Sequence, residues 1–352
     1  MCRICFLIRA FVIECTCAPA VPAIDRHDHH DRINFGPRMT APAIPADRPV
    51  SLSTEDANIV RRASVWQLLA RHWGVRIGGI AMALLTLIAL AAPVLGTVDP
   101  TLFDPGSRDL LPGASGEITT LDGESIKHQF MMGSDSFGRD IYSRVIYGTR
   151  VSLIVGLACA LVSVLLGVIA GLSAGYLRWL DMPLMRVMDG IMAIPGILIA
   201  IALVALWKAS LLSVIVAIAI PEIPRVTRLV RALVLSIREE PYVEAAISLG
   251  TSTFKIMFGH ILPNTVAPLI VQGTYICASA ILTEAILSFL GVGLPTDFPT
   301  WGNIMAEGRV QFQQFPHNVF FPGIFLAVAV LAVNILGDGL RDVLDPKMAK
   351  KV

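Results

Sequence analysis

Residues 239–264, EEPYVEAAISLGTSTFKIMFGHILPN, form a polar segment between two strongly apolar runs, and the rest of the chain is organised around this segment. Pro241 follows two glutamates, and both proline and negative charge suit the first turn of a helix. The residues that follow predict a short helix over 242–249. Gly250 then fits the left-handed position that commonly ends a helix.

A second short helix is predicted directly after this glycine. The Thr-Ser pair at 251–252 can cap its start, and we expect it to end over 260–264, at a histidine, a proline and an asparagine. Ala245 and Ala246 are expected to form a small-residue face on the first helix, where another surface can approach the backbone. The segment is therefore predicted to be a helical hairpin. A surface hairpin of a soluble domain is the plain alternative.

The composition identifies the class of protein that carries this hairpin. Of the 352 residues, 55% are hydrophobic and 16% are charged, whereas soluble domains carry about 25% charged residues. The chain is therefore predicted to be an all-α, polytopic membrane protein. Its formal net charge of +1 gives no indication of a nucleic-acid partner.

Six transmembrane helices are predicted from apolar runs, because about 20 residues of helix cross a hydrocarbon core. Arginines precede the first run and aspartates follow it, so the positive-inside rule places the N-terminus in the cytoplasm, and basic residues near the end place the C-terminus there too. In the fourth run Glu222 and Arg225 are three apart and can pair on one helix face. The predicted spans cover residues 77–96, 151–174, 190–206 with a kink at Pro195-Gly196, 211–237, 266–291 and 319–336.

The remaining segments are expected to lie outside the membrane. Residues 1–38 have no regular period and are interpreted as a disordered tail or an over-extended start. Cysteines and histidines gather there, so a metal site is the alternative. Residues 39–76 are predicted to be a cytoplasmic N-terminal segment, 97–148 a periplasmic loop, and 341–352 a cytoplasmic tail.

The hairpin also carries a family resemblance. Glu244-Ala245-Ala246, then Gly250, then Leu262-Pro263, resembles the EAA loop of bacterial ABC importer permeases. The variant with His260 resembles the peptide and nickel (DppC/OppC-type) branch of that family. The GSDSFGRD motif and the residues after it, up to position 150, resemble the segment before the second span in the same branch.

This resemblance implies the type I importer permease fold, with an ABC transmembrane domain over residues 149–340 and the coupling loop at 239–264, in the bacterial inner membrane. It implies four kinds of partner: a second, homologous permease in a heterodimer, two ATP-binding subunits, a solute-binding protein outside, and membrane lipid. The residues that it assigns to docking of the ATP-binding subunit are Glu244, Ala245, Ala246, Gly250, Leu262 and Pro263.

No catalytic or metal-binding residue is predicted. The sequence contains no GxxxxGK[ST] or HExxH motif, so it has no phosphate cradle or zinc-protease helix of these types. We therefore expect no enzyme activity and no directly bound cofactor, with ATP hydrolysed by the partner subunits. The resemblance implies a transmembrane permease subunit of an ATP-driven importer that carries dipeptides or longer peptides by alternating access. A nickel or glutathione-type permease is the alternative. An ATP-independent secondary transporter and a structural scaffold or sensor are the rival classes.

Polar residues inside the apolar runs are the candidates for the substrate path, because such residues are costly in a membrane. Gln272, Glu284 and Asn334 are selected on this ground. Glu284 has a structural alternative as the interhelical partner of an arginine such as Arg309, or a position near the outer interface. In the loop before the second span, we expect Asp135, Arg139, Asp140 and Arg144 to form an ion-pair network.

Overall fold

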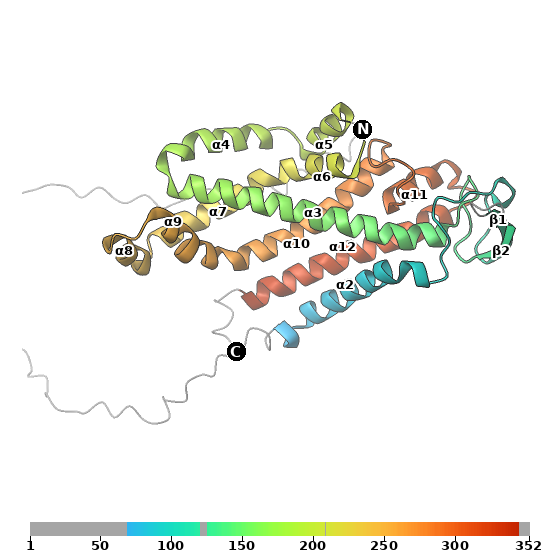
Figure 1. Ribbon diagram of the computed structural model, residues 1–352, viewed down its shortest axis with the longest axis horizontal. Helices are drawn as coiled ribbons and strands as arrows, with labels where there is room; N and C mark the ends of the chain where they lie inside the picture. The colour runs from blue at the N-terminus through green and yellow to red at the C-terminus, as the bar shows by residue number, and fades with distance from the viewer. Residues whose placement is uncertain (1–68, 120–124, 208, 345–352) are drawn as a thin grey trace, which may run out of the picture. The chain divides into compact units, whose positions relative to one another are not determined.

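The computed structural model describes residues 69–119, 125–207 and 209–344, all within one structural unit, 62–352. The described part is mostly helical (Figure 1). The expectations for residues 1–68 and 345–352 lie outside it. The α-helices are α2 (Trp73–Ala91), α3 (Ile141–Tyr176), α4 (Arg178–Met192), α5 (Gly196–Leu206), α6 (Leu211–Ala219), α7 (Ile223–Arg238), α8 (Pro241–Ser248), α9 (Thr253–Ile256), α10 (Leu262–Phe289), α11 (Trp301–Gly308) and α12 (His317–Leu344).

The described part of the structure contains two short strands, so the expectation of an all-α protein is not fully met. β1 (Ala114–Thr119) and β2 (Ser125–Phe130) pair as an antiparallel hairpin, with Ala114 opposite Phe130. Phe130 is buried, so the hairpin has a small core of its own. Short turns connect or extend the other elements: η1 (Ala92–Val94), η2 (Pro105–Ser107), η3 (Ile220–Glu222), the π-helical turn η4 (Met257–Ile261) and η5 (Arg309–Gln311).

Four of the described helices are long and apolar enough to cross a membrane: Trp73–Val94, Ile141–Tyr176, Thr253–Phe289 and His317–Leu344. The pair α4 and α5 makes a fifth if its two bent halves are taken as one span. The expected number of six spans is therefore only partly matched. The fourth predicted run is divided into α6, η3 and α7, and α7 carries arginines at 225, 228, 231 and 238.

The third predicted span differs most from expectation. Residues 178–186, which lie between the second and third predicted spans, begin helix α4, and the chain then bends by 87° before α5. The kink at Pro195-Gly196 is confirmed, since α5 begins at Gly196, but it separates two helices. Two aspartates of α4 pair with arginines of α7: Arg231 Nε lies 2.5 Å from Asp181 Oδ1, and Arg228 Nη2 lies 2.5 Å from Asp189 Oδ1.

Helix α3 begins ten residues before the predicted second span. Asp140 Oδ2 accepts a hydrogen bond from the backbone N–H of Ser143 at 2.9 Å, which caps the helix at Ile141. The loop motif after position 140 therefore forms the first turns of this helix.

Glycines bring α3 into close contact with α7. A Cβ atom added at Gly167, Gly171 or Gly175 would lie 2.5 to 2.7 Å from the Cβ of Val226, Val230 or Val234, respectively. Only a residue without a side chain fits at such distances, as expected for helices that pack through small residues. Gly156 makes a similarly close contact, against Ile281 of α10. Helices α3, α7 and α10 thus form one packed core.

Candidate functional site

The predicted hairpin is present, with its turn closed by backbone hydrogen bonds. Helix α8 ends at Ser248, and Gly250 has a φ of 73°, as the sequence predicts. The N–H of Thr251 donates to the carbonyl of Ala246 at 3.1 Å, and that of Gly250 donates to the carbonyl of Ile247 at 2.9 Å. This pair of bonds is the Schellman motif, which requires a left-handed residue at Gly250.

The second half of the hairpin differs from the prediction. Helix α9 does not end near His260; it continues through η4 into α10, so residues 253–289 form one helical rod. The N–H of Leu262 donates to the carbonyl of Met257, a bond of the wider π type. This change of hydrogen-bond register lets the rod pass Pro263, which has no N–H to donate, without ending.

The two alanines of α8 lie on different faces, which corrects the expectation of a single small-residue face. Ala246 is buried beside Val243 and packs in the cluster that includes Ile256 and Ile261. Ala245 is exposed. The reason is the helical period of about 100° per residue, which turns neighbouring positions to different sides.

The exposed side of the hairpin is both apolar and charged. Leu249 is 85% exposed at the turn, and Phe254 is 70% exposed. Glu244, Ala245 and Pro263 are exposed as well, whereas Leu262 is half-buried. Large apolar side chains exposed together on one surface are typical of an interaction site.

A staple ties the start of α8 to the start of α10. The Asn264 side-chain amide donates to the hydroxyl of Tyr242 at 3.0 Å and to the carbonyl of His260 at 2.7 Å. Burial and the nearby Glu240 charge raise the pKa of Tyr242 above its usual value, so the phenol keeps its proton at neutral pH. The base of the hairpin is thus tied to the long rod through Asn264.

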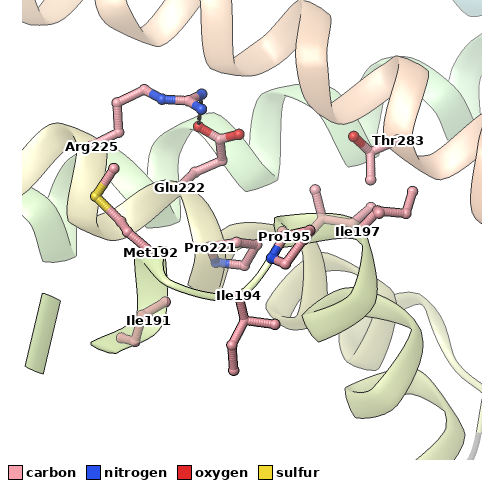
Figure 2. Close-up of a pocket in the computed structure, with 11 residues that line it drawn as sticks. Ile191, Met192, Ile194, Pro195, Ile197, Pro221, Glu222, Arg225 and Thr283 are labelled. Carbon is pink, nitrogen blue, oxygen red and sulfur yellow. Dashed lines mark hydrogen bonds and ion pairs between the residues drawn. The ribbon is translucent and has the colours of Figure 1, made fainter. Parts of the chain in front are cut away.

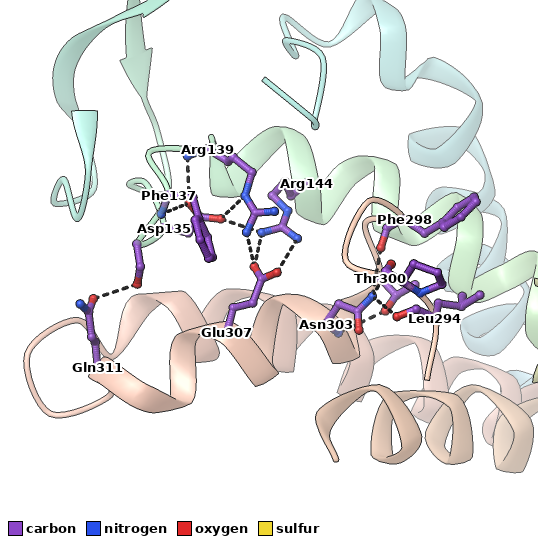
Figure 3. A network of polar contacts seen from close by, with 12 residues as sticks. Asp135, Phe137, Arg139, Arg144, Leu294, Phe298, Thr300, Asn303, Glu307 and Gln311 are labelled. Carbon is purple, nitrogen blue, oxygen red and sulfur yellow. Dashed lines mark hydrogen bonds and ion pairs between the residues drawn. The ribbon is translucent and has the colours of Figure 1, made fainter. Parts of the chain in front are cut away.

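A buried ion network lies around the start of α3 (Figure 3). Asp135 Oδ2 is 2.7 Å from Arg139 Nε and 2.6 Å from Arg144 Nη1. Both arginines also reach Glu307 Oε2 of α11 at 2.5 Å. The expected network is therefore real, but its fourth member is Glu307, which sequence spacing alone could not select because it lies more than 160 positions away.

Asp140 has a different role from the one expected. It caps α3 through Ser143, and its Oδ2 lies 3.6 Å from Nε2 of His128 on β2. Asp140 is therefore outside the network of Asp135, Arg139, Arg144 and Glu307.

Two hollows lie beside α7 and α10. The first, which we name the break pocket, has a volume of about 210 Å³ and is lined by residues that include Pro195, Gly196, Pro221, Glu222, Arg225 and Thr283 (Figure 2). The second, the groove, has a volume of about 700 Å³ and is lined by residues that include Leu229, Leu233, Gln272, Tyr275 and Arg341.

Comparison with known proteins decides what kind of protein this is. Residues 163–350 match the family described as binding-protein-dependent transport system inner membrane component. The chain belongs to this family. The expectation of a membrane permease with a transport role is confirmed, and the hairpin and the network lie in a transport component rather than an enzyme.

Relatives of this permease are similar over most of its length. It is 48% identical to a probable peptide ABC transporter permease of Sinorhizobium fredii over 83% of this chain and 95% of that one. It is 42% identical to a dipeptide transport system permease of Alkalihalophilus pseudofirmus, over 77% of this chain and 85% of that one. It is 43% identical to a glutathione transport system permease of Pectobacterium atrosepticum, over 64% of this chain and 75% of that one.

The three residues selected for the substrate path lie in different environments of the permease. Gln272 lines the groove. Asn334 is half-buried on α12 and lines neither the groove nor the break pocket. Glu284 is fully buried near the end of α10, where its Oε1 accepts from the Ser288 hydroxyl at 2.8 Å.

The suggested pairing of Glu284 with Arg309 is not formed. Arg309 Nη1 donates to the carbonyl of Phe289 at 2.8 Å, and its guanidinium lies over the Phe289 ring. Glu284 contacts no described arginine, and it lines neither hollow. The polar residues that line the break pocket are Glu222, Arg225 and Thr283. Glu222 and Arg225 pair at 2.7 Å, as their spacing predicts.

Proposed function

We propose that this permease is one transmembrane subunit of an ATP-driven importer that carries peptides across the bacterial inner membrane. The names of its relatives, a probable peptide permease at 48% identity and a dipeptide permease at 42%, support peptides as the solute. Glutathione is the second candidate, on the name of a relative at 43% identity. Nickel remains an alternative from the sequence resemblance alone.

We propose further that the hairpin couples ATP hydrolysis to movement of the spans. This proposal rests on how α8 packs against the neighbouring helices. Its inner face, at Val243 and Ala246, packs in the same cluster as Val230 and Val234 of α7. Its outer face is exposed, and the Asn264 staple joins it to α10. A push on the outer face therefore moves α7 and α10 together, because a packed core transmits displacement.

In this proposal Glu244, Ala245, Gly250, Leu262 and Pro263 form or shape the docking surface for an ATP-binding subunit. Ala246 is buried and does not face the ATP-binding subunit. It contributes to docking because it packs under α8 and holds this helix in place. The ATP-binding subunits hydrolyse ATP, and this chain needs no cofactor of its own. ATP and solute then favour two different arrangements of the spans, which is alternating access.

The proposed topology follows from the hairpin. Residues 239–264 face the cytoplasm, together with 39–76 and 341–352, and residues 97–148 face the periplasm. The α6–η3–α7 segment is the fourth span in chain order, and it brings the number of spans to six. It lies within a transmembrane domain at 149–340. The full assembly contains a second, homologous permease, two ATP-binding subunits, a solute-binding protein and surrounding lipid, and no nucleic acid.

Reconstitution tests this proposal. The chain is purified with the permease, ATP-binding and solute-binding subunits encoded beside it and placed in lipid vesicles. A mixture of di- and tripeptides is added with the solute-binding protein, and imported peptides are identified by mass spectrometry. We expect import with ATP and none with a non-hydrolysable analogue.

Two results would contradict the proposal. Uptake by this chain without ATP would identify a secondary transporter. If no peptide in the mixture is imported, and glutathione or nickel added in its place is imported with ATP, then the solute is glutathione or nickel and not a peptide.

A further inference from the structure

The break pocket forms where two interrupted helices meet. The first interruption is the 87° bend between α4 and α5, and the second is η3, between α6 and α7. They are in contact, because a Cβ atom added at Gly196 would lie 3.1 Å from the Cβ of Pro221. Helix interruptions within membrane-spanning regions are tolerated where they line a cavity, and they commonly form the substrate sites of transporters.

An ion pair lies beside these interruptions (Figure 2). Arg225 Nη1 donates to Glu222 Oε2 at 2.7 Å, and the two side chains are 57% and 13% exposed, respectively. The rest of the lining is largely apolar and includes Met192, Ile197 and Ile218. Charged groups among apolar residues in a membrane protein are costly and are usually retained for function.

This pair does not hold two distant parts of the chain together. The next two arginines of α7, Arg228 and Arg231, pair with aspartates of α4 and so join two helices. Arg225 instead pairs with Glu222, three positions before it at the junction of η3 and α7. A brace between helices therefore explains the pairs of Arg228 and Arg231, but not the pair of Arg225.

Both side chains retain hydrogen-bonding capacity. Within the described part of the chain, each of the two side chains makes one hydrogen bond, and this is the bond that joins them. Glu222 Oε1 is thus left to accept, and Arg225 Nε and Nη2 are left to donate. The pocket therefore offers one anionic acceptor and one cationic donor side by side, within an apolar lining.

The break pocket and the groove lie along the same surface of the permease. Positions 222, 225, 229 and 233 recur every three or four residues, so they share one face of the η3–α7 segment. Gln272 and Thr283 are about three turns apart on α10 and also share a face. Glu222, Arg225 and Thr283 line the break pocket, and Leu229, Leu233 and Gln272 line the groove. A solute that leaves the break pocket thus meets the groove next.

We propose that Glu222 and Arg225 form a binding subsite for the two charged ends of a short peptide. Glu222 accepts hydrogen bonds from the peptide ammonium group, and Arg225 donates to the peptide carboxylate, so the internal pair is exchanged for two contacts with the solute. The apolar lining receives the peptide side chains without selecting among them. This assignment rests on the proposed function, because it requires a solute that carries both charges.

The test uses the reconstituted complex and the mixture of di- and tripeptides with free ends. The solute-binding protein is saturated with peptide, so that its own preferences are the same for every variant. Glu222→Gln and Arg225→Gln each remove one charge with little change in size. We expect each variant to import peptides about tenfold more slowly than wild type, because a hydrogen bond to a charged group is lost.

Two further variants separate binding from a structural role. Arg228→Gln removes the same charge one turn further along α7 but lines neither hollow, and we expect import within about twofold of wild type, as for a surface ion pair. The double variant Glu222→Arg with Arg225→Glu restores an ion pair in reverse order. We expect it to remain slow, because each peptide end then meets a charge of its own sign.

The outcomes are distinct. Wild-type import by the double variant would show that import does not depend on which of the two positions carries which charge, and would overturn the assignment of Glu222 to the ammonium group and Arg225 to the carboxylate. Normal import by both single variants would overturn it as well. If the wild-type complex imports no peptide at all, the proposed function fails and the subsite fails with it. If wild type imports peptides and the single variants do not differ from it, only the subsite fails.

Discussion

Arg144 and Glu307, 163 positions apart in the sequence, form an ion pair with 2.5 Å between Nη1 and Oε2. The arginine side chain is 1% exposed, and it also reaches Asp135 at 2.6 Å. The pair fastens α11 to the start of α3, so it joins the segment before the last span to the first long helix of the core. An arginine at this depth is stable only because two carboxylates neutralise it.

Removal of this arginine should destabilise the permease strongly. Arg144→Met leaves Asp135 and Glu307 buried with less compensation, and breaking a buried ion pair on one side costs about 3–5 kcal/mol. We expect a clearly lower melting temperature for the detergent-purified protein. Arg228→Gln is the control, since its pair with Asp189 is about half exposed and should contribute about 0–1 kcal/mol. Equal melting of the two variants would contradict the role of the network.

The turn after α8 should tolerate asparagine but not valine. Gly250 has a φ of 73° and open space around the position of a Cβ atom, so backbone strain and not crowding sets the cost of a substitution. The left-handed conformation costs about 1–2 kcal/mol for most residues and is more accessible to asparagine. Gly250→Val should therefore reduce co-purification of the ATP-binding subunit, with Gly250→Asn close to wild type. Two variants with equal loss would show that the glycine is needed for another reason.

The two alanines of α8 should behave differently when each is changed to glutamate. Ala246 is buried, so Ala246→Glu places a charge in the cluster under α8 and should lower the melting temperature of the permease itself. Ala245 is exposed, so Ala245→Glu should melt like wild type but lose the ATP-binding subunit during purification. Retention of that subunit by Ala245→Glu would remove Ala245 from the docking surface.

The glycine seam between α3 and α7 should be sensitive to size. A Cβ atom at Gly171 would lie 2.5 Å from the Cβ of Val230, whereas nothing lies within 4 Å at Gly190. We therefore expect Gly171→Leu to lower the melting temperature and Gly190→Leu to leave it nearly unchanged. Failure of Gly171→Leu to destabilise the protein would contradict this packing.

Several features followed from the sequence alone because they depend on near neighbours. Apolar runs identified the long helices, and Pro241 and Gly250 marked the two ends of α8 through their backbone preferences. The spacing of Glu222 and Arg225 predicted their pair. The coupling motif was sufficient to indicate the family that comparison then confirmed.

Other features were decided only by packing between distant segments. No local pattern identified Glu307 as the partner of Arg144, showed that Ala246 faces inward, or indicated that the rod runs on through Pro263. The contact between Gly196 and Pro221, which forms the break pocket, depends on two helix interruptions meeting in space. Local sequence acts over a few residues through backbone preference and hydropathy, whereas burial and ion pairing join whichever side chains the assembled helices bring together.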